Sequence, residues 1–367
     1  MKLASYNVEN LFDRARAMNL KTQDEGAGIL AQHAELNGIL SQTAYSAPDK
    51  KRIVALMKKL GIDKKDDGKF VILRQNHGHL IKRGKGGLQV VANGRADWIG
   101  WVDLRVEAVD EIATQNTGRV IAEIDADVLG LVEAESRPAL MRFSTVLKSV
   151  KASPYDHIML IDGNDERGID VGLMTRKNFP IVEIRSHVDD ADSTGRIFSR
   201  DCAEYTIATP SGNKLVLLVN HLKSKGFGKP ADSDAKRERQ AKRVKEIYDG
   251  ARQGGATFVA VIGDFNDFPT SSPLRPLIAG TDLKDISTHA AFQDGGFPGT
   301  FGSCGPANKI DYILLSPALL QKVRAGGIFR NGLWPGKRPK KWQVYDTIAE
   351  TIHAASDHAA IWAELDI

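Results

Sequence analysis

The chain has 367 residues, 42% hydrophobic and 26% charged, a composition typical of a folded globular protein rather than a disordered or fibrous one. No apolar run approaches the ~18 residues of a membrane span, and the first residues lack a secretory apolar core, so we expect a cytoplasmic protein with no membrane partner. The net charge of +4 allows a polyanionic partner without requiring one, and two isolated cysteines exclude a disulfide scaffold and disfavour a thiolate zinc site.

Strand-like apolar runs follow one another along the chain, separated by segments with helical patterning. Several of these runs end on polar residues, at Glu133, His221 and Asp264. In α/β architectures the carboxyl ends of strands carry the chemistry, because the core ends there and loops begin. We therefore expect these residues to meet. The predicted strands are 2–8, 125–134, 169–176, 214–224, 257–267, 309–316 and 359–367, and the predicted helices are 139–150 and 234–251.

Residues 14–110 are not required by this alternation. They contain 17 Lys and Arg against 11 Asp and Glu, an excess larger than that of the whole chain. Two stretches, 26–42 and 48–62, have helical patterns, and 70–95 is typical of a β-hairpin. We interpret 14–110 as an insertion of helices and a β-hairpin into a single domain that spans 1–367.

A second basic stretch lies at 329–345, where five cationic side chains alternate with aromatic ones. Basic groups beside aromatic faces suit a phosphate backbone with stackable bases, and a solvated surface loop is the other interpretation. The residues concerned are Phe329, Arg330, Trp334, Lys337, Arg338, Lys340, Lys341 and Trp342.

Polar residues of the kinds used in catalysis recur in six short motifs. Each alone is most simply a turn, a helix cap or a structural histidine. Together they form an inventory that a single fold could bring into one site. The residues are Asn7 and Glu9 in SYNVENLFD, Glu133 in GLVEAES, His221 in VNHLKSK, Asp264 and Asn266 in VIGDFND, Asp311 in NKIDYILLS, and Asp357 and His358 in ASDHAA.

This inventory suits the cleavage of a phosphate ester, which requires an activated water, groups that hold the phosphoryl oxygens and help for the leaving oxyanion. Glu133, Asp357 and Asn7 offer hard oxygen ligands, which suit Mg²⁺ or Mn²⁺ better than zinc. Two histidines can exchange protons near neutral pH, and an aspartate that accepts a hydrogen bond from a histidine fixes its tautomer. The sequence has no HExxH motif of the kind used in zinc catalysis.

The ordered set Asn-Val-Glu-Asn, Glu133, His221, Gly-Asp-Phe-Asn, Ile-Asp-Tyr and Ser-Asp-His resembles the endonuclease/exonuclease/phosphatase superfamily. The resemblance runs from residue 2 to 367 apart from the insertion. The stretches 166–176 and 220–225 resemble most closely a deoxyribonuclease-like bacterial branch of this superfamily. The resemblance implies an α/β (α+β) fold, a four-layer α/β/β/α sandwich of two packed mixed β-sheets flanked by helices.

The resemblance also implies a role for each motif residue. The metal positions are Asn7 and Glu133, with Glu9 beside them and Asp357 as a further ligand, and the ion is Mg²⁺, with Mn²⁺ or Ca²⁺ as substitutes. The catalytic positions are Asp264 and Asn266 at the attacking water and scissile phosphate, His358 as the catalytic histidine, Asp311 as the carboxylate that orients it, and His221 as a phosphate contact. Candidate contacts to substrate phosphates are Arg167, Lys223 and Arg338.

The sequence therefore predicts a monomeric Mg²⁺-dependent phosphodiesterase, a nuclease that hydrolyses DNA or RNA by in-line attack of an activated water. Asp264 and His358 are both candidates for the general base, and the sequence does not choose between them. A phosphomonoesterase or phospholipid-type phosphodiesterase on the same core is the alternative. A binding module that has lost catalysis is a third interpretation, which the complete set of motif residues disfavours.

Overall fold

A computed structural model describes residues 1–20, 23–226, 229–336 and 341–367 and divides the chain into two compact units. The larger unit contains Met1–Phe12, Val109–Lys225 and Lys229–Ile367, and the smaller contains Asp13–Ala108. In the described part of the chain, no helix combines the length and the apolar character that crossing a bilayer demands.

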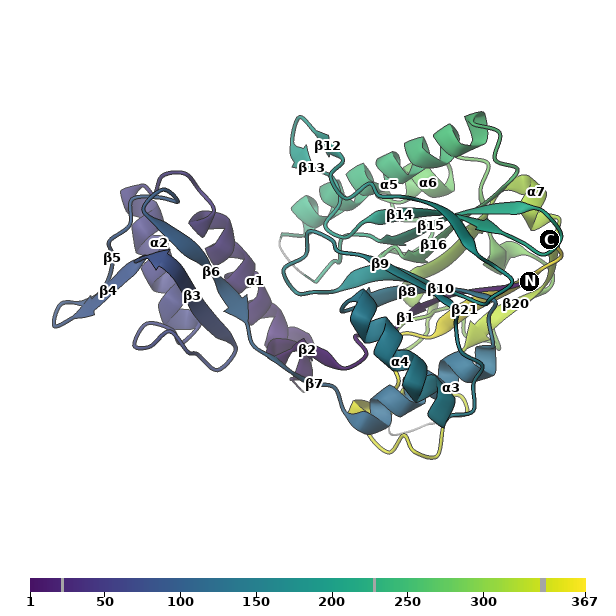
Figure 1. The fold of residues 1–367 in the computed structure, drawn as a ribbon, viewed down its shortest axis with the longest axis horizontal. Helices are drawn as coiled ribbons and strands as arrows, with labels where there is room; N and C mark the ends of the chain where they lie inside the picture. Colours follow the sequence, from purple (N-terminus) through teal and green to yellow (C-terminus); the bar gives the residue numbers. More distant parts are fainter. Residues whose placement is uncertain (21–22, 227–228, 337–340) are drawn as a thin grey trace. The chain divides into compact units, whose positions relative to one another are not determined.

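The larger unit is built on two mixed β-sheets (Figure 1). In each sheet a parallel central pair is flanked by an antiparallel neighbour: β1 pairs with β8 and β21, and β15 pairs with β16, which pairs with β19. The first sheet has the order β18 (Phe292–Gln293), β20 (Val323–Phe329), β21 (Ala360–Leu365), β1 (Lys2–Asn7), β8 (Val128–Ala134), β10 (Asp170–Thr175) and β9 (His157–Ile161). The second has the order β11 (Ile181–Arg185), β14 (Cys202–Ala208), β15 (Lys214–His221), β16 (Phe258–Asp264), β19 (Asp311–Leu315) and β17 (Lys284–Asp285).

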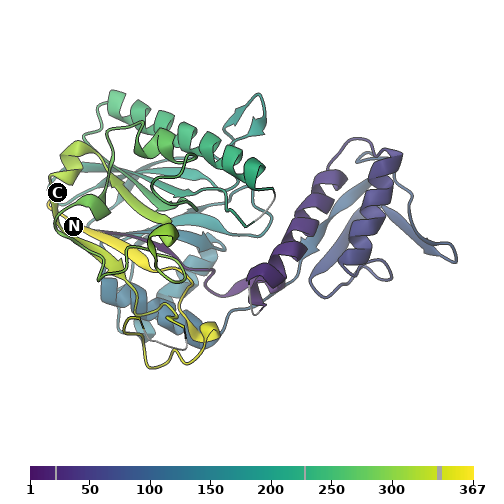
Figure 2. The same ribbon diagram turned by 180° about the vertical axis from the view of Figure 1, so that it is seen from behind.

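The two sheets pack face to face through a buried apolar layer that includes Leu3 and Val132 from the first sheet and Leu217, Ile262 and Ile313 from the second. Helices cover the outer faces, as Figures 1 and 2 show. The first sheet is covered by α3 (Glu111–Ile124) and α4 (Arg137–Ser149), and the second by α5 (Pro230–Gln253) and α6 (Arg275–Ile278). A short α7 (Pro317–Leu320) follows β19. The predicted four-layer fold is confirmed.

The smaller unit has its own hydrophobic core, which includes Leu36, Leu56, Trp98 and Val102. Two helices, α1 (Gln23–Leu40) and α2 (Ala47–Lys59), lie on one face of a two-stranded sheet of β3 (Val71–Gly78) and β6 (Trp98–Leu104) (Figures 1 and 2). The remaining pairs are β2 (Asp13–Ala15) with β7 (Val106–Ala108), and β4 (Ile81–Gly84) with β5 (Gly87–Val90).

The stretch expected as one hairpin, 70–95, is divided between two sheets. β4 and β5 form a tight hairpin, whereas β3 pairs with β6, which lies beyond the predicted segment. The reason is the alternation along β6, where Trp98, Gly100, Val102 and Leu104 are buried and Ile99, Trp101 and Asp103 are exposed or half-buried. That pattern gives β3 a partner with one apolar face, which the polar β4 and β5 do not offer.

The contact between the sheets predicts the effect of a single added side chain. Gly130 on β8 faces the second sheet, and a Cβ there would lie 2.3 Å from Cδ1 of Ile262. We expect Gly130→Val to lower the free energy of unfolding by about 1–3 kcal/mol through overpacking. Combined with Ile262→Ala, it should cost less than the two single losses added together. Urea denaturation of the four proteins measures this coupling.

Gly250 on α5 provides the control, because no heavy atom lies within 4 Å of a Cβ built there. Gly250→Ala should leave stability unchanged or raise it by up to about 1 kcal/mol through helix propensity. Strictly additive losses for Gly130→Val and Ile262→Ala would show that the sheets do not meet at these two residues.

Candidate active site

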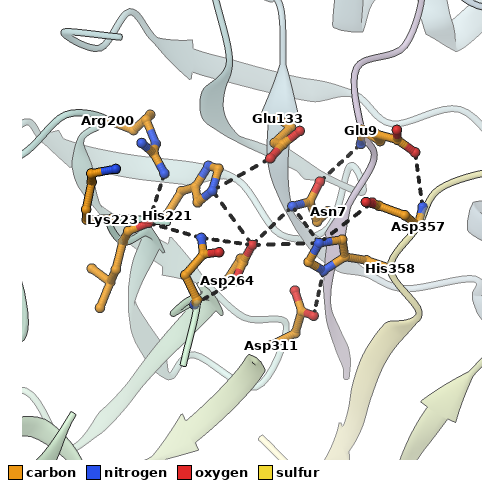
Figure 3. Close-up of polar contacts among 12 residues, drawn as sticks. Asn7, Glu9, Glu133, Arg200, His221, Lys223, Asp264, Asp311, Asp357 and His358 are labelled. Carbon is orange, nitrogen blue, oxygen red and sulfur yellow. Dashed lines mark hydrogen bonds and ion pairs between the residues drawn. The ribbon is translucent and has the colours of Figure 1, made fainter. Parts of the chain in front are cut away.

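The ends of five strands from both sheets bring the predicted polar residues together (Figure 3). Asn7 is the last residue of β1, and Glu133 lies one residue from the end of its parallel neighbour β8. In the second sheet His221 and Asp264 are the last residues of the parallel strands β15 and β16 and pair with each other in register. Asp311 begins the antiparallel β19 directly opposite Asp264. These polar residues at strand ends therefore lie close together, as expected from the sequence.

His358 and Asp311 form a buried hydrogen-bonded pair that joins the two sheets. Nδ1 of His358, just before β21, lies 2.8 Å from Oδ2 of Asp311, and both residues are at least 94% buried. The imidazole also packs against the ring of Phe301, with 4.9 Å between ring centroids. Since Nδ1 is engaged with the carboxylate, Nε2 is the nitrogen that faces Asp264 and Asn7, at 3.8 and 3.4 Å.

Ser356 fixes the loop that carries this histidine. Its Oγ donates to the backbone oxygen of Asn7 at 2.8 Å and accepts from the backbone N–H of His358 at 3.0 Å. One buried hydroxyl therefore ties the end of β1 to the position of the imidazole. This explains the serine of the Ser-Asp-His motif, to which the sequence assigned no role.

Buried negative charge shapes the ionisation of the central residues. The pKa of His358 lies well above its ordinary value: burial lowers it, but the carboxylates of Asp311, Asp357 and Asp264 raise it more. The pKa of Asp264 is raised to about 7, because burial and the neighbouring Asp311 disfavour a second carboxylate charge. Near neutral pH the site therefore favours a protonated His358 beside an Asp264 that readily exchanges its proton.

Asp264 is held by amide donors. The backbone N–H of Asn266 donates to Oδ1 at 2.7 Å, and the side-chain amides of Asn266 and Asn7 both donate to Oδ2 at 3.3 Å. Asn266 has a φ of 54°, in the left-handed region, which turns the chain back so that its N–H reaches the carboxylate. The Gly-Asp-Phe-Asn motif therefore builds a fixed carboxylate with an amide beside it.

The residues predicted to hold a metal lie on the Glu133 side of Asp264 and His358 (Figure 3). The backbone N–H of Glu9 donates to Oδ1 of Asn7 at 3.1 Å, and that of Asp357 donates to Oε2 of Glu9 at 3.1 Å. Glu9 and Glu133 both have positive φ, 47° and 63°, a strained conformation for glutamate that is often kept at functional sites. Hydrogen bonds therefore help to hold these oxygen-bearing side chains in place despite the backbone strain.

The predicted donor set fits a hard divalent cation, since it consists of three carboxylates, those of Glu9, Glu133 and Asp357, and the amide oxygen of Asn7. The described residues contain one set of three acidic or histidine side chains whose donor atoms all lie within 4.8 Å, namely Asp264, Asp311 and His358. Asp311 is already bonded to His358, so this trio is better suited to proton transfer than to metal binding. The ligand set Asn7, Glu9, Glu133 and Asp357 stays a prediction.

His221 lies between the acidic centre and a group of cations. Its Nε2 is 3.7 Å from Oε1 of Glu133 and 3.7 Å from Oδ2 of Asp264. Burial and the charges of Arg200 and Arg167 hold its pKa well below the ordinary value, so the ring is neutral and can offer one N–H to a phosphate oxygen. Its Nδ1 has no hydrogen-bond partner among the described residues.

The predicted phosphate contacts have different positions. Arg167 forms a bidentate salt bridge with Asp165, in which Nε donates to Oδ1 at 2.9 Å and Nη2 donates to Oδ2 at 2.7 Å. Lys223 lies near His221, and its pKa falls to about 8 because of burial and the charges of Arg200 and Arg167. Arg338 lies outside the described residues. The basic-aromatic stretch is partly structural: Arg330 is 7% exposed and donates to the backbone oxygens of Asp294, Phe297 and Gly299.

Arg200 is a polar residue of the site that sequence reasoning missed. Its guanidinium is 1% exposed, donates to Oδ2 of Asp165 at 3.1 Å and to the backbone oxygen of Leu222 at 2.9 Å, and lies near His221 in Figure 3. Burial lowers its pKa. The available signal was the pair Arg200-Asp201 directly before the apolar run at 202–208, a charged pair where a strand enters the core.

Glu135 has a structural role. Its Oε1 accepts the backbone N–H groups of Leu11 and Phe12, at 3.0 and 2.6 Å, and so holds the loop that follows β1. Of the two glutamates near the end of β8, Glu133 points to the centre of the site and Glu135 supports the loop beside it.

A family model described as "Endonuclease/Exonuclease/phosphatase family" matches residues 101–329 of the sequence. Comparison with curated proteins gives no significant match. Among solved structures, the fold is similar to that of mannosyl-6-phosphatase Bt3783 of Bacteroides thetaiotaomicron VPI-5482, at 18% identity and a TM-score of 0.52, over 70% of this chain and 92% of that one.

Two further structures show the same fold. An endonuclease/exonuclease/phosphatase family protein of Bacteroides thetaiotaomicron has 18% identity and a TM-score of 0.51, over 70% of this chain and 90% of that one. The human Nocturnin catalytic domain has 18% identity and a TM-score of 0.50, over 71% of this chain and 88% of that one. At these identities the likeness supports the fold and not a particular substrate.

The pairing of His358 with Asp311 predicts that replacing Asp311 changes the pKa of His358, which can be measured without substrate. Asp311→Asn removes the carboxylate that stabilises the imidazolium, so the pKa of His358 should fall relative to the unmodified protein. Imidazole NMR titration in EDTA measures it. Asp346→Asn is the control, since that side chain is 90% exposed, and should leave the pKa of His358 unchanged. An equal pKa in Asp311→Asn would rule out the pairing.

Proposed function

The chain belongs to the endonuclease/exonuclease/phosphatase family, whose members are phosphoester hydrolases, and we propose that it is a metal-dependent phosphodiesterase that cleaves nucleic acid. The observation that carries the proposal is the buried His358–Asp311 pair facing Asp264, with carboxylates on one side and cations on the other. Phosphoester hydrolysis needs a group that accepts a proton from water and a charged group that donates a hydrogen bond to the phosphate, and this arrangement contains both. It also places carboxylates on one side of the phosphate and cations on the other.

Glu133 and Asn7, with Glu9 and Asp357 beside them, are the residues that would hold the metal ion. The ion we propose is Mg²⁺, with Mn²⁺ or Ca²⁺ as substitutes, because the donors are carboxylate and amide oxygens. When bound, a divalent cation supplies charge stabilisation for a non-bridging phosphate oxygen and for the leaving group.

We assign Asp264 as the general base. A carboxyl with a pKa of about 7 accepts a proton from water far better than an ordinary aspartate does. His358, whose pKa is raised, is charged at neutral pH and is better suited to donate a hydrogen bond to the phosphate than to accept a proton. Asp311 keeps Nε2 of His358 directed toward the reacting centre.

Asn266 and His221 complete the support for the phosphate. The amide of Asn266 lies beside Asp264 and also donates to the backbone oxygen of Leu222 at 3.1 Å, which fixes its orientation. The neutral ring of His221 offers an N–H without adding charge. With these donors in place, water activated by Asp264 attacks the phosphorus in line, and no side chain forms a covalent intermediate.

The positive charge of the smaller unit favours a nucleic acid as the substrate. Its residues 13–108 contain 17 Lys and Arg and 11 Asp and Glu, although the whole chain has an excess of only four positive charges. Such a unit attracts a phosphate backbone. Its first and last residues, Asp13 and Ala108, are paired in register, as an insertion that leaves and re-enters one domain requires. We propose that this insertion holds the substrate.

A phosphomonoesterase is the second candidate. The buried guanidinium groups of Arg167 and Arg200 near His221 would suit the extra negative charge of a phosphate monoester. One similar structure is also named a mannosyl-6-phosphatase. A phosphomonoesterase would have no use for the basic smaller unit, which is why we place the nuclease first.

The function is tested with supercoiled plasmid, single-stranded RNA and a bis(aryl) phosphate diester, each with Mg²⁺ or EDTA. We expect Mg²⁺-dependent cleavage of a nucleic acid, and a loss of about 10²–10⁴-fold in turnover for His358→Ala and Asp264→Asn. His157→Ala is the control, because that histidine lies on the edge strand β9 away from the site. Cleavage of no nucleic acid, or cleavage that survives His358→Ala, would refute the proposal.

The role of the smaller unit is tested by replacing 14–107 with a short Gly-Ser turn, which the pairing of Asp13 with Ala108 allows. The shortened protein should keep its hydrolysis of the small diester. Its affinity for an oligonucleotide, measured in EDTA, should fall, and so should the slope of log K against log salt concentration. An unchanged slope would show that the unit does not contact the phosphate backbone.

A further inference from the structure

We propose that a second phosphate group of the substrate binds a cationic cluster of Arg167, Arg200, Lys223 and Lys236, on the far side of His221 from the reacting centre. The proposal rests on the proposed phosphodiesterase function and adds to it a specificity site. Figure 3 shows Arg200 and Lys223 on one side of His221, with Asp264 and His358 on the other. The ligand chemistry is a phosphate attached to the same molecule as the phosphate that is cleaved.

The two arginines of the cluster are held rigidly around one carboxylate. Asp165 accepts from Arg167 at 2.9 and 2.7 Å and from Arg200 at 3.1 Å. Asp165 is itself largely buried, and the two guanidinium groups lower its pKa, so it carries a full negative charge. Nε of Arg200 has no hydrogen-bond partner among the described residues. A fully buried guanidinium with an unused donor is costly to maintain unless it serves a ligand.

The two lysines are brought to the arginines by backbone contacts. The backbone oxygen of Leu222 accepts from Arg200, which places the next residue, Lys223, beside that guanidinium. The backbone N–H of Lys223 donates to Oε1 of Gln240 on α5 at 2.7 Å. Lys236 lies one helical turn before Gln240 on the same face of α5, and it is close enough to Lys223 for its charge to lower the pKa of that lysine.

The positive charges of the cluster repel one another. The pKa of Lys223 is lowered to about 8, because burial and the charges of Arg200, Arg167 and Lys236 outweigh the attraction of Asp165. The pKa of Lys236 is lowered for the same reasons, burial and the charge of Arg200. Nearby Asp170 compensates only in part, since burial raises its pKa to about 7. A bound phosphate would relieve this mutual repulsion.

The cluster is too close to the reacting centre to serve a separate ligand. The backbone oxygen of Leu222 accepts both from Nη2 of Arg200, at 2.9 Å, and from Nδ2 of Asn266, at 3.1 Å. One carbonyl oxygen therefore separates the cationic cluster from the amide that we assign to the scissile phosphate. A diester has a single negative charge, which His358, Asn266 and His221 already serve. A neighbouring phosphate of the same substrate would therefore lie beside the four cations.

The experiment compares kcat/KM for the thymidine dinucleotide TpT, which has one phosphate, with pTpT and TpTp, which have two. We expect the unmodified protein to prefer one of the two-phosphate substrates by about tenfold or more, the effect of one charge-assisted hydrogen bond. The ratio should fall to about one in Lys236→Ala. Lys242→Ala is the matched control, on the same helix but paired with Glu238 and 59% exposed, and it should keep the ratio.

A binding measurement separates this proposal from the proposed function. In EDTA, thymidine 3′,5′-bisphosphate should bind about tenfold more tightly than thymidine 5′-monophosphate, and Lys236→Ala should remove that difference. Fructose 1,6-bisphosphate against fructose 6-phosphate tests a sugar phosphate as the source of the second group. If no nucleic acid is cleaved but a bisphosphate preference depends on Lys236, the phosphodiesterase fails and the site stands. No preference in any pair, or equal losses in Lys236→Ala and Lys242→Ala, would overturn the site.

Discussion

The site depends on how the two packed sheets are positioned relative to each other. Neither sheet contains a complete set of reacting groups: Asn7 and Glu133 lie on strands of the first, His358 lies just before β21 of the same sheet, and His221, Asp264 and Asp311 lie on strands of the second. The 2.8 Å hydrogen bond between His358 and Asp311 crosses from one to the other, as do the contacts of Asn7 with Asp264. Apolar packing between the sheets therefore determines the distances on which the chemistry rests, and residues that contact no substrate, such as Gly130 and Ile262, contribute to it indirectly.

A second constraint is the separation of charge across the site. Carboxylates gather on the Glu133 side, and the cationic Arg200 and Lys223 lie beyond His221 (Figure 3). The two groups shift ionisation in opposite directions: the carboxylates raise the pKa of His358, and the cations help to lower the pKa of His221. Two buried histidines thus differ in charge because of their surroundings alone, one suited to donate as a cation and the other as a neutral ring. This separation of charge across the site also suits an anionic substrate that binds beside a metal cation.

The sequence predicted the fold and the central residues well, because the residues that react lie at strand ends, where periodicity and motif coincide. Asn7, His221, Asp264, Asp311 and His358 all meet as expected, although their catalytic roles stay predictions. What it did not predict depends on contacts between distant segments. Arg200 was missed because arginines are usually exposed, and its burial depends on Asp165 and Leu222. The pairing of β3 with β6 was missed because the intervening hairpin β4–β5 obscured it.

The central claim is that one buried centre hydrolyses a phosphodiester by direct attack of water, with Asp264 as the base and no covalent enzyme intermediate. The stereochemical course at phosphorus tests this most directly. A phosphorothioate diester of one configuration, hydrolysed in ¹⁸O-labelled water, should give product with inverted configuration, because a single in-line displacement inverts the phosphorus. Retention of configuration would require two displacements through a covalent intermediate, and it would contradict the account.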